Sequence, residues 1–328
     1  MSQRVLKFVV MRQCGKWAKI GVVCLAALFT GCGPQADLAL KFSPGDRTKY
    51  KIVTEDIKDF KFEQPSLGKA RSEPRSTTAQ IKFVQEIESV GENGDCVAEI
   101  TIRGLKYLAK DKDGVKFDFD SDREGDRKKP LAKLLGNSYK IKLASDGGVQ
   151  VLDAKKIRRT VSGGQDGRVA KALLSDEGIR KRHEILFLPD SEKNLLYKGD
   201  SWSRIEATEQ RLMVPKTFEK TYTLKDVKGQ VGSQKAVVEM TATETATPPG
   251  TVSRISGGIG LFANMFDTEE DYNGEMVLDL DTGKVVEYYE KFVTKYIAAE
   301  PSARQKPDKG PDLLTIILTY STTMEMLD

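Results

Sequence analysis

The side chains best suited to nucleophilic, acid–base or metal chemistry are scarce in this chain of 328 residues, which has four cysteines and one histidine, His183. A single imidazole rules out metal sites built from several histidines, and it leaves one candidate base for a histidine-dependent triad. His183 stands in the run Lys-Arg-His-Glu at 181–184, on the polar side of a short predicted helix. We therefore expect a solvated histidine rather than a catalytic base.

Two other patterns resemble ligand-binding loops but are incomplete. The run Asp-Phe-Asp-Ser-Asp at 118–122 begins like the calcium loop of an EF-hand, but Arg123 and Lys129 stand where glycine and glutamate are needed. The glycine-rich runs at 163–167 and 257–260 lack the Gly-Lys-Ser/Thr ending of a phosphate loop. The sequence also lacks the Gly-x-Ser-x-Gly motif of α/β-hydrolases. We expect a solvated acidic turn and two flexible loops, with neither a metal nor a cofactor.

The most specific chemical signal lies in the first 32 residues. Five basic side chains and no acidic one precede Cys32, and an apolar run of ten residues covers Ile20–Phe29. Ten apolar residues are about half of what crosses a hydrocarbon core of about 30 Å, so the pattern predicts a signal peptide over residues 1–31. The residues directly before Cys32 are Leu28, Phe29, Thr30 and Gly31.

Leu28–Cys32 resembles the bacterial lipobox, in which small side chains precede a cysteine that accepts a diacylglyceryl group, although Phe29 stands where Leu, Val or Ala is commoner. The resemblance implies that Cys32 carries the lipid, with palmitate as an acyl chain, and that residues 32–38 tether the fold to a membrane of the bacterial cell envelope. No Asp follows Cys32, which resembles sorting to the outer membrane, with the fold facing the periplasm or the exterior. A start at Met11 gives a signal of more ordinary length than a start at Met1.

The excess of positive charge belongs to the predicted signal. The chain has 52 basic and 48 acidic side chains, and 52 less the five of the signal leaves 47 basic against 48 acidic. A nucleic-acid-binding protein would keep a basic excess, so we expect no nucleic-acid partner. Beyond Cys32 only Cys96 remains, so we expect no intramolecular disulfide. Cys96 shares the apolar face of a predicted strand with Ala98, Ile100 and Ile102, which predicts a buried thiol.

Beyond residue 38, apolar and polar side chains alternate with a period of two, which is typical of half-buried antiparallel strands. Asp/Gly turns between such runs predict hairpins. The clearest runs lie at 81–102, 138–152, 221–242, 271–293 and 316–320. Helices are predicted at 130–135 and 166–186, the second with Ser175 as an N-cap. Polar segments that contain proline indicate loops at about 61–79, 244–258 and 300–311.

The order of these predicted elements occurs twice. Ser-Pro-Gly-Asp at 43–46 opens the first half, and Lys-Gly-Asp-Ser-Trp at 198–202 opens the second. Each opening leads to a long hairpin, then to a strand, an Asp/Gly turn and another strand. We predict a mainly β fold of antiparallel sheets, built from two related β-meander halves with one or two short helices between them. The first β-rich repeat covers 39–158, a helical connector 159–193, and the second repeat with its C-terminal strand 194–328.

With the lipobox and the Leu-Phe-Leu-Pro … Gly-Asp-Ser-Trp passage at 186–202, this arrangement resembles a family of uncharacterised bacterial lipoproteins with no assigned function. The resemblance spans most of the chain beyond the signal, but its motifs are structural turns, so it implies a fold and no site. A looser likeness is to the half-barrel of periplasmic lipoprotein carriers, which hold acyl chains under a curved sheet.

Two function classes remain open. We favour a membrane-anchored envelope lipoprotein with a non-enzymatic role, in which a curved sheet holds an apolar ligand such as a lipid, or a sheet surface docks an envelope protein. The alternative is a surface enzyme that acts on an envelope polymer through two carboxylates, which needs neither cysteine nor histidine. An apolar cavity without ionisable lining favours the carrier, and a cleft with two carboxylates about 5–10 Å apart favours the enzyme.

Overall fold

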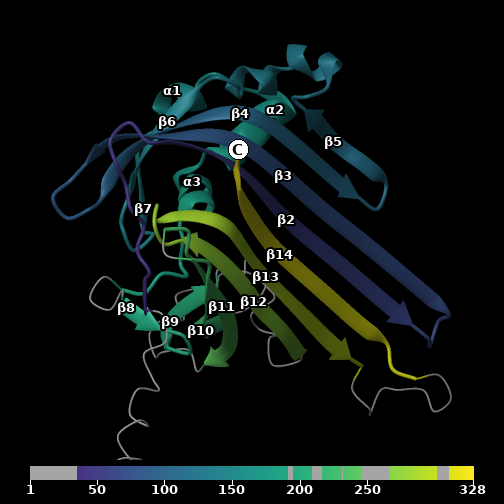
Figure 1. The fold of residues 1–328 in the computed structure, drawn as a ribbon. Helices are drawn as coiled ribbons and strands as arrows, with labels where there is room; N and C mark the ends of the chain where they lie inside the picture. Colours follow the sequence, from purple (N-terminus) through teal and green to yellow (C-terminus); the bar gives the residue numbers. More distant parts are fainter. Residues whose placement is uncertain (1–34, 191–194, 209–215, 231, 246–265, 301–309) are drawn as a thin grey trace, which may run out of the picture. The chain divides into compact units, whose positions relative to one another are not determined.

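The computed structural model describes residues 35–190, 195–208, 216–230, 232–245, 266–300 and 310–328 (Figure 1). The predicted signal over 1–31 and the lipobox with Cys32 lie outside these ranges. So do most residues of the predicted loops at 244–258 and 300–311. Within the described ranges, every helix is too short or too polar to span a bilayer.

Antiparallel strands dominate the described residues. They are β1 (Gln35–Asp37), β2 (Arg47–Gln64), β3 (Lys69–Val90), β4 (Cys96–Asp111), β5 (Gly114–Asp120), β6 (Ser138–Leu143), β7 (Val149–Asp153), β8 (Leu195–Tyr197), β9 (Ser201–Thr208), β10 (Lys216–Lys228), β11 (Lys235–Thr245), β12 (Asp267–Asp279), β13 (Lys284–Ala299) and β14 (Leu313–Leu327). Twelve of them form one sheet in the order β7-β6-β4-β3-β2-β14-β13-β12-β11-β10-β9, with β5 paired to β4. The remaining two, β1 and β8, form a separate ribbon. The prediction of a mainly β, antiparallel fold is confirmed.

The helices of the described residues are short and all precede the second half of the chain. They are the 3₁₀-helices η1 (Glu124–Lys128) and η2 (Pro130–Leu134), and the α-helices α1 (Lys155–Arg158), α2 (Gly164–Leu173) and α3 (Asp176–His183). The helix predicted over 166–186 is therefore two helices, because Ser175 starts a new one: its hydroxyl accepts a hydrogen bond from the backbone N–H of Gly178 at 3.0 Å. Figure 1 shows α3 inside the curve of the sheet.

The two halves share a turn as well as an order of strands. Before β2, the N–H of Gly45 donates to the carbonyl of Ile87 at 2.8 Å, and the N–H of Ile87 donates to the carbonyl of Asp46 at 2.9 Å. A β-bulge follows Ile87 directly in β3. The second half repeats both bonds and the bulge, with Gly199, Asp200 and Leu224 in the same roles. Both glycines adopt a positive φ, which a β-carbon disfavours, so the Gly-Asp pair opens both halves.

The C-terminal strand β14 joins the halves into one sheet. It pairs with β13 of the second half on one side and with β2 of the first half on the other. The alternation of Ile316, Leu318 and Tyr320 therefore belongs to a central strand. It places these three side chains on the same face of the sheet.

The loop predicted at 61–79 is wrong. β2 runs for 18 residues and β3 for 22, and they are joined by a tight turn at 65–68. The composition of this segment is polar because this part of the hairpin extends beyond the main core. Its strands therefore lack the apolar alternation from which a strand is predicted. Pro74 is accommodated because β4 pairs with β3 only from Ser76 onward, so no strand lies beside Pro74 on that side of β3.

The tether predicted over 32–38 is also too long. Gln35–Asp37 pairs with β8, and the side chains of Ala36 and Leu38 are fully buried. The N–H of Leu40 then donates to the carbonyl of Ser145 at 2.9 Å. Burial of Ala36 and Leu38 makes this segment part of the fold, because removing its apolar surface from water stabilises the docked strand.

Candidate functional site

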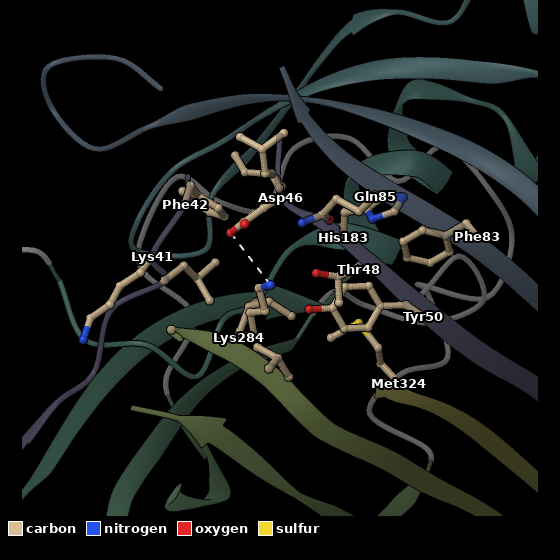
Figure 2. Close-up of a pocket in the computed structure, with 16 residues that line it drawn as sticks. Lys41, Phe42, Asp46, Thr48, Tyr50, Phe83, Gln85, His183, Lys284 and Met324 are labelled. Atoms are coloured by element: carbon tan, nitrogen blue, oxygen red, sulfur yellow. Dashed lines mark ion pairs between the residues drawn. The ribbon is translucent and has the colours of Figure 1, made fainter. Parts of the chain in front are cut away.

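A small cavity at the inner face of the sheet has space only for water molecules. It measures about 50 Å³ and brings side chains of both halves together, including Tyr50, His183 and Met324 (Figure 2). An ion pair of 3.8 Å between Asp46 and Lys284 links the opening turn of the first half to β13 of the second. A water molecule needs at least about 10–15 Å³, so this space suits a few waters and no organic ligand.

The larger cavity measures about 800 Å³ and lies between the sheet and the segment around α3. Strands β2, β9, β10, β12, β13 and β14 all contribute to its lining, so the sheet must curve around it. Its apolar lining includes Ile185, Leu186, Phe292, Leu318 and Met324. This volume falls within the range of about 300–1,000 Å³ that is usual for small-molecule sites, which makes the cavity the candidate functional site.

A buried ionic cluster forms one wall of the large cavity. The Lys220 side chain is 2% exposed, and its Nζ lies 2.7 Å from Glu206 and 2.9 Å from Glu290. The hydroxyls of Tyr272 and Tyr288 each donate to Glu290 at 2.6 Å. The Lys220 Nζ also sits over the Tyr272 ring, 4.5 Å from its centre. Every charge in the cluster therefore has close partners, which offsets the cost of removing it from water.

The electrostatics of the cluster keep it ionised. Burial alone would raise the pKa of Glu290, but the charge of Lys220 and the hydrogen bonds from Tyr272 and Tyr288 outweigh burial and lower that pKa. Burial would lower the pKa of Lys220, but Glu290 and Glu206 outweigh it and raise that pKa. Lys220 is thus a fixed cation and Glu290 a fixed anion at neutral pH.

The segment after α3 is held against the sheet by Phe187. This ring is fully buried and contacts the rings of Tyr222 and Tyr288, with centroid distances of 5.2 and 4.9 Å. It can approach the sheet because β12 has a glycine beneath it: a β-carbon at Gly274 would lie 2.6 Å from the Phe187 ring. The Leu-Phe-Leu-Pro passage is therefore a structural contact that fixes Ile185 and Leu186 at the edge of the cavity.

The charges that line the large cavity balance. The acidic side chains are Asp56, Glu177, Glu184, Glu206 and Glu290, and the basic ones are Lys58, Arg180, Lys181, Arg182 and Lys220. Ion pairs connect Asp56 with Lys58, Glu177 with Lys181, and Glu184 with Arg180. The lining therefore offers polar groups without a net charge.

His183 is buried, so the expectation of a solvated histidine is wrong. Its Nε2 lies 2.7 Å from the Tyr139 hydroxyl, and its ring meets Phe83 edge-on with a centroid distance of 4.9 Å. Arg182 donates to the same hydroxyl oxygen at 3.3 Å, which leaves the Tyr139 hydrogen for His183. Burial, and then the charge of Arg182, lower the pKa of His183 well below its usual range. The imidazole is thus a neutral acceptor inside the core.

The free energy of unfolding should therefore decrease in mild acid because of His183. The unfolded chain binds a proton at this imidazole near pH 6.5, and the folded chain does not. Relative to His183→Gln, the free energy of unfolding of the native chain should be constant above about pH 6.5 and fall by up to about 1.4 kcal/mol per pH unit below it. Urea titrations of both proteins between pH 7.5 and 5 check this. Parallel pH profiles would contradict a buried neutral imidazole, and no other histidine contributes.

The acidic turn at 118–122 is an ion-paired structure. Arg123 bonds both oxygens of Asp118 at 2.8 and 2.9 Å, and Lys129 lies 2.6 Å from Asp126. The two residues that break the EF-hand pattern therefore supply cations to the turn. The hydrogen bond from Lys129 and the N–H of Asp120 lower the pKa of Asp126 to about 2. Among the described residues, no cluster of histidine, cysteine and carboxylate groups has the arrangement of a metal site.

The remaining side chains singled out from the sequence have structural surroundings. Cys96 is buried with Ala98, Ile100 and Ile102, as predicted, and burial raises the pKa of its thiol to about 12. Trp202 stacks on Tyr222 with a centroid distance of 5.8 Å. Neither side chain lines the large cavity.

In the lining of the large cavity, Glu206 and Glu290 form a carboxylate pair of the kind that the enzyme alternative needs. Both bind the same lysine nitrogen, so their spacing is compatible with the range of about 5–10 Å that carboxylate-based hydrolysis uses. That chemistry requires one carboxyl with a raised pKa as the proton donor. Here Lys220 stands between the two and lowers the pKa of Glu290. Glu290 is therefore not the protonated acid that such a reaction needs.

Comparison with known proteins gives distant structural likenesses. No family model and no curated protein matches the chain. The chain is similar to lipovitellin, in a structure concerned with lipid–protein interactions in that protein, at 10% identity and a TM-score of 0.44; the match covers 88% of this chain and 26% of that one. The chain thus spans about a quarter of that lipovitellin chain.

Two further solved structures are similar over most of both chains. DynF from the dynemicin biosynthesis pathway of Micromonospora chersina has 6% identity and a TM-score of 0.17, covering 93% of this chain and 92% of that one. OpdQ of Pseudomonas aeruginosa has 9% identity and a TM-score of 0.22, covering 85% and 98%. All three TM-scores lie below 0.5, so none of these likenesses bears on the function of the chain.

Proposed function

We propose that the chain is a non-enzymatic binding protein of the bacterial cell envelope, anchored through a lipid on Cys32, which holds an amphiphilic molecule in its large cavity. The observation that carries the proposal is the cavity of about 800 Å³ between the curved sheet and the segment after α3. Its volume suits a ligand of lipid or lipid-fragment size.

The lining supports an amphiphile rather than a purely apolar ligand. Hydroxyl groups and the Lys220–Glu290 cluster occupy the wall formed by β10, β12 and β13. On β14, Leu318 lines the cavity and also packs against a second apolar cluster that contains Ile316 and Tyr296. The polar part of the ligand would lie at the ionic cluster, and its hydrocarbon part would extend along β14 toward Ile316.

The balance of charge narrows the ligand class. Because the five carboxylates of the lining face five basic side chains, the cavity exerts little net attraction on an anion or a cation. An uncharged or zwitterionic amphiphile suits it best, such as a phosphatidylethanolamine or a glycolipid. The paired charges then serve as local hydrogen-bonding groups.

The envelope location rests on the sequence. The basic segment, the short apolar run and the small residues before Cys32 are the features of a lipoprotein signal. Attachment of the lipid at Cys32 would hold the binding domain at the membrane surface, where amphiphiles are concentrated.

The experiment that tests ligand binding is native mass spectrometry of the full chain, purified in mild detergent from a bacterial host. We expect an additional mass of lipid size that leaves on denaturation. A phosphatidylcholine with a nitrobenzoxadiazole group on one acyl chain should bind the protein and gain fluorescence. Leu318→Trp should reduce that binding at least tenfold, because the larger side chain fills the apolar part of the cavity.

Ile317→Trp is the matched control. It makes a comparable replacement at the adjacent residue of β14, whose side chain points to the opposite face of the sheet. We expect its probe affinity to equal that of the native chain. An empty native mass together with equal affinities for all three proteins would refute the cavity as a binding site.

A further inference from the structure

The ribbon of β1 and β8 has one buried and one exposed face. Residues Gln35–Asp37 pair with Leu195–Tyr197, with Ala36 opposite Leu196. Ala36 is fully buried and Leu196 packs against the core. On the other face, the side chains of Leu195 and Tyr197 are 57% and 39% exposed. Large apolar side chains together on an exposed face indicate a contact surface more often than isolated ones do.

The ribbon is firmly attached to the domain. Leu38, directly after β1, is fully buried. Three residues further on, the N–H of Lys41 donates to the carbonyl of Gly283 at 3.3 Å. The turn after β8 is fixed as well, because the N–H of Gly199 donates to the carbonyl of Leu224 at 2.8 Å. A surface on this ribbon would therefore move with the whole domain.

Cys32 precedes Gln35 by only three residues. A fully extended chain spans at most about 3.6 Å per residue, so three residues can separate Cys32 from Gln35 by no more than about 11 Å. This length is shorter than the diameter of a small domain and leaves the domain little freedom to move away from a membrane that holds Cys32.

We propose that the exposed face of the β1–β8 ribbon, with Leu195 and Tyr197, rests on the lipid bilayer that holds the acylated Cys32. The inference depends on the lipid anchor of the proposed function. It adds an orientation, with the ribbon side of the domain facing the membrane.

The side chains of this face suit a membrane interface. Tyrosine places its ring at the level of the headgroups, and leucine adds apolar area. Lys198 is exposed at the following turn, and Lys41 is exposed near β1. Each lysine has a surface carboxylate beside it, Asp226 and Asp37, so anionic headgroups would add a small attraction to the apolar contact.

The test uses the full chain, isolated from bacterial membranes and reconstituted into phosphatidylethanolamine–phosphatidylglycerol vesicles. Leu195→Cys is labelled with a nitrobenzoxadiazole fluorophore, and quenching by lipids with a nitroxide near the headgroup is measured. The control is Val115→Cys, which replaces a residue that is 58% exposed. It belongs to β5, which Figure 1 shows well apart from β8. The unsubstituted chain, labelled in parallel, corrects for other thiols, and Cys96 is buried.

We expect the label at position 195 to lose much of its emission in vesicles with nitroxide lipids and the label at 115 to lose none. The mass of the N-terminal peptide shows whether Cys32 is acylated. If Cys32 is acylated and both labels are quenched equally, the proposed orientation is wrong but the lipid anchor stands. An N-terminal peptide without lipid would overturn the anchor and the inference together. Ligand retention in the cavity is measured separately, so its outcome does not affect this test.

Discussion

Replacing Lys220 by methionine is expected to lower the free energy of unfolding by about 3–5 kcal/mol at pH 7, because it leaves two carboxylates without their shared cation. Lys220 is 2% exposed and lies within 3 Å of Glu206 and Glu290. Methionine has a similar length and flexibility, so the loss reflects charge rather than volume. Denaturant titration of the two proteins measures the difference.

The pH dependence distinguishes this loss from a packing defect. In the native chain the pKa of Glu290 lies below its ordinary value, so its contribution to stability is present above about pH 4.5 and is lost as the pH falls through the lowered pKa. Without Lys220, burial and repulsion from Glu206 would raise the pKa of Glu290. Protonation of Glu290 then removes part of the destabilisation in the variant. The difference in the free energy of unfolding between the native chain and Lys220→Met should therefore decrease from pH 7 to pH 5.

Lys225→Met is the control for this substitution. Lys225 lies on the same strand, is exposed, and pairs with Glu239 at 2.9 Å. Exposed ion pairs contribute about 0–1 kcal/mol, so this variant should be nearly as stable as the native chain. If Lys220→Met were as mild as Lys225→Met, or if its deficit were the same at pH 5 and pH 7, the cluster would not be a buried, ionised one.

Two patterns in the sequence indicate this cluster, although neither is a recognised motif. Phe218, Lys220, Tyr222 and Leu224 share one face of β10, and Lys220 is the only charged member of that apolar series. Glu290 stands likewise between Tyr288 and Phe292 on β13. Alternation alone shows that each side chain faces the core side of the sheet. It does not show that the two strands place them together, because β11 and β12 separate β10 from β13 in the sheet.

The strands and the repeated Gly-Asp turn are predictable because they depend on local properties. Alternation sets which side chains face the core, and Gly-Asp turns with a positive φ leave a recognisable pair of residues. The prediction of a solvated His183 is wrong because the charged neighbours Arg182 and Glu184 make this part of the sequence look like an exposed helix face. Only the packing of α3 into the curve of the sheet determines that His183 and Arg182 are buried.

The cavity is beyond prediction from the sequence for a related reason. Its lining comes from six strands and one helix, spread from Asp56 to Met324. Period-two alternation predicts an inner face but not the curvature of the sheet, and curvature decides whether that face is filled or hollow. An apolar lining was the feature expected of a carrier, and a pair of carboxylates was the feature expected of an enzyme. The cavity has an apolar region beside a set of paired charges, so each feature occurs in part.

Phe187→Ala is the second change with a large expected effect, a loss of about 3–5 kcal/mol in the free energy of unfolding. The ring is fully buried between Tyr222 and Tyr288. Its loss also frees Ile185 and Leu186 at the edge of the cavity, so binding of the fluorescent phosphatidylcholine should weaken as well. Phe62→Ala removes the same side chain at a position 39% exposed and should cost less than about 1 kcal/mol.

A double-mutant cycle with Gly274 tests whether this ring is held by its glycine. Alone, Gly274→Ala should cost about 1–3 kcal/mol, because the new β-carbon would lie 2.6 Å from both the Phe187 ring and the carbonyl oxygen of Tyr289. In the Phe187→Ala background half of that conflict is gone, so the same substitution should cost at least about 0.5 kcal/mol less. Gly125→Ala, whose β-carbon would meet nothing within 4 Å, should be neutral in both backgrounds. Strict additivity of Gly274→Ala and Phe187→Ala would mean that the segment after α3 is not seated on β12. In that case the edge of the cavity would have to be held by contacts other than Phe187.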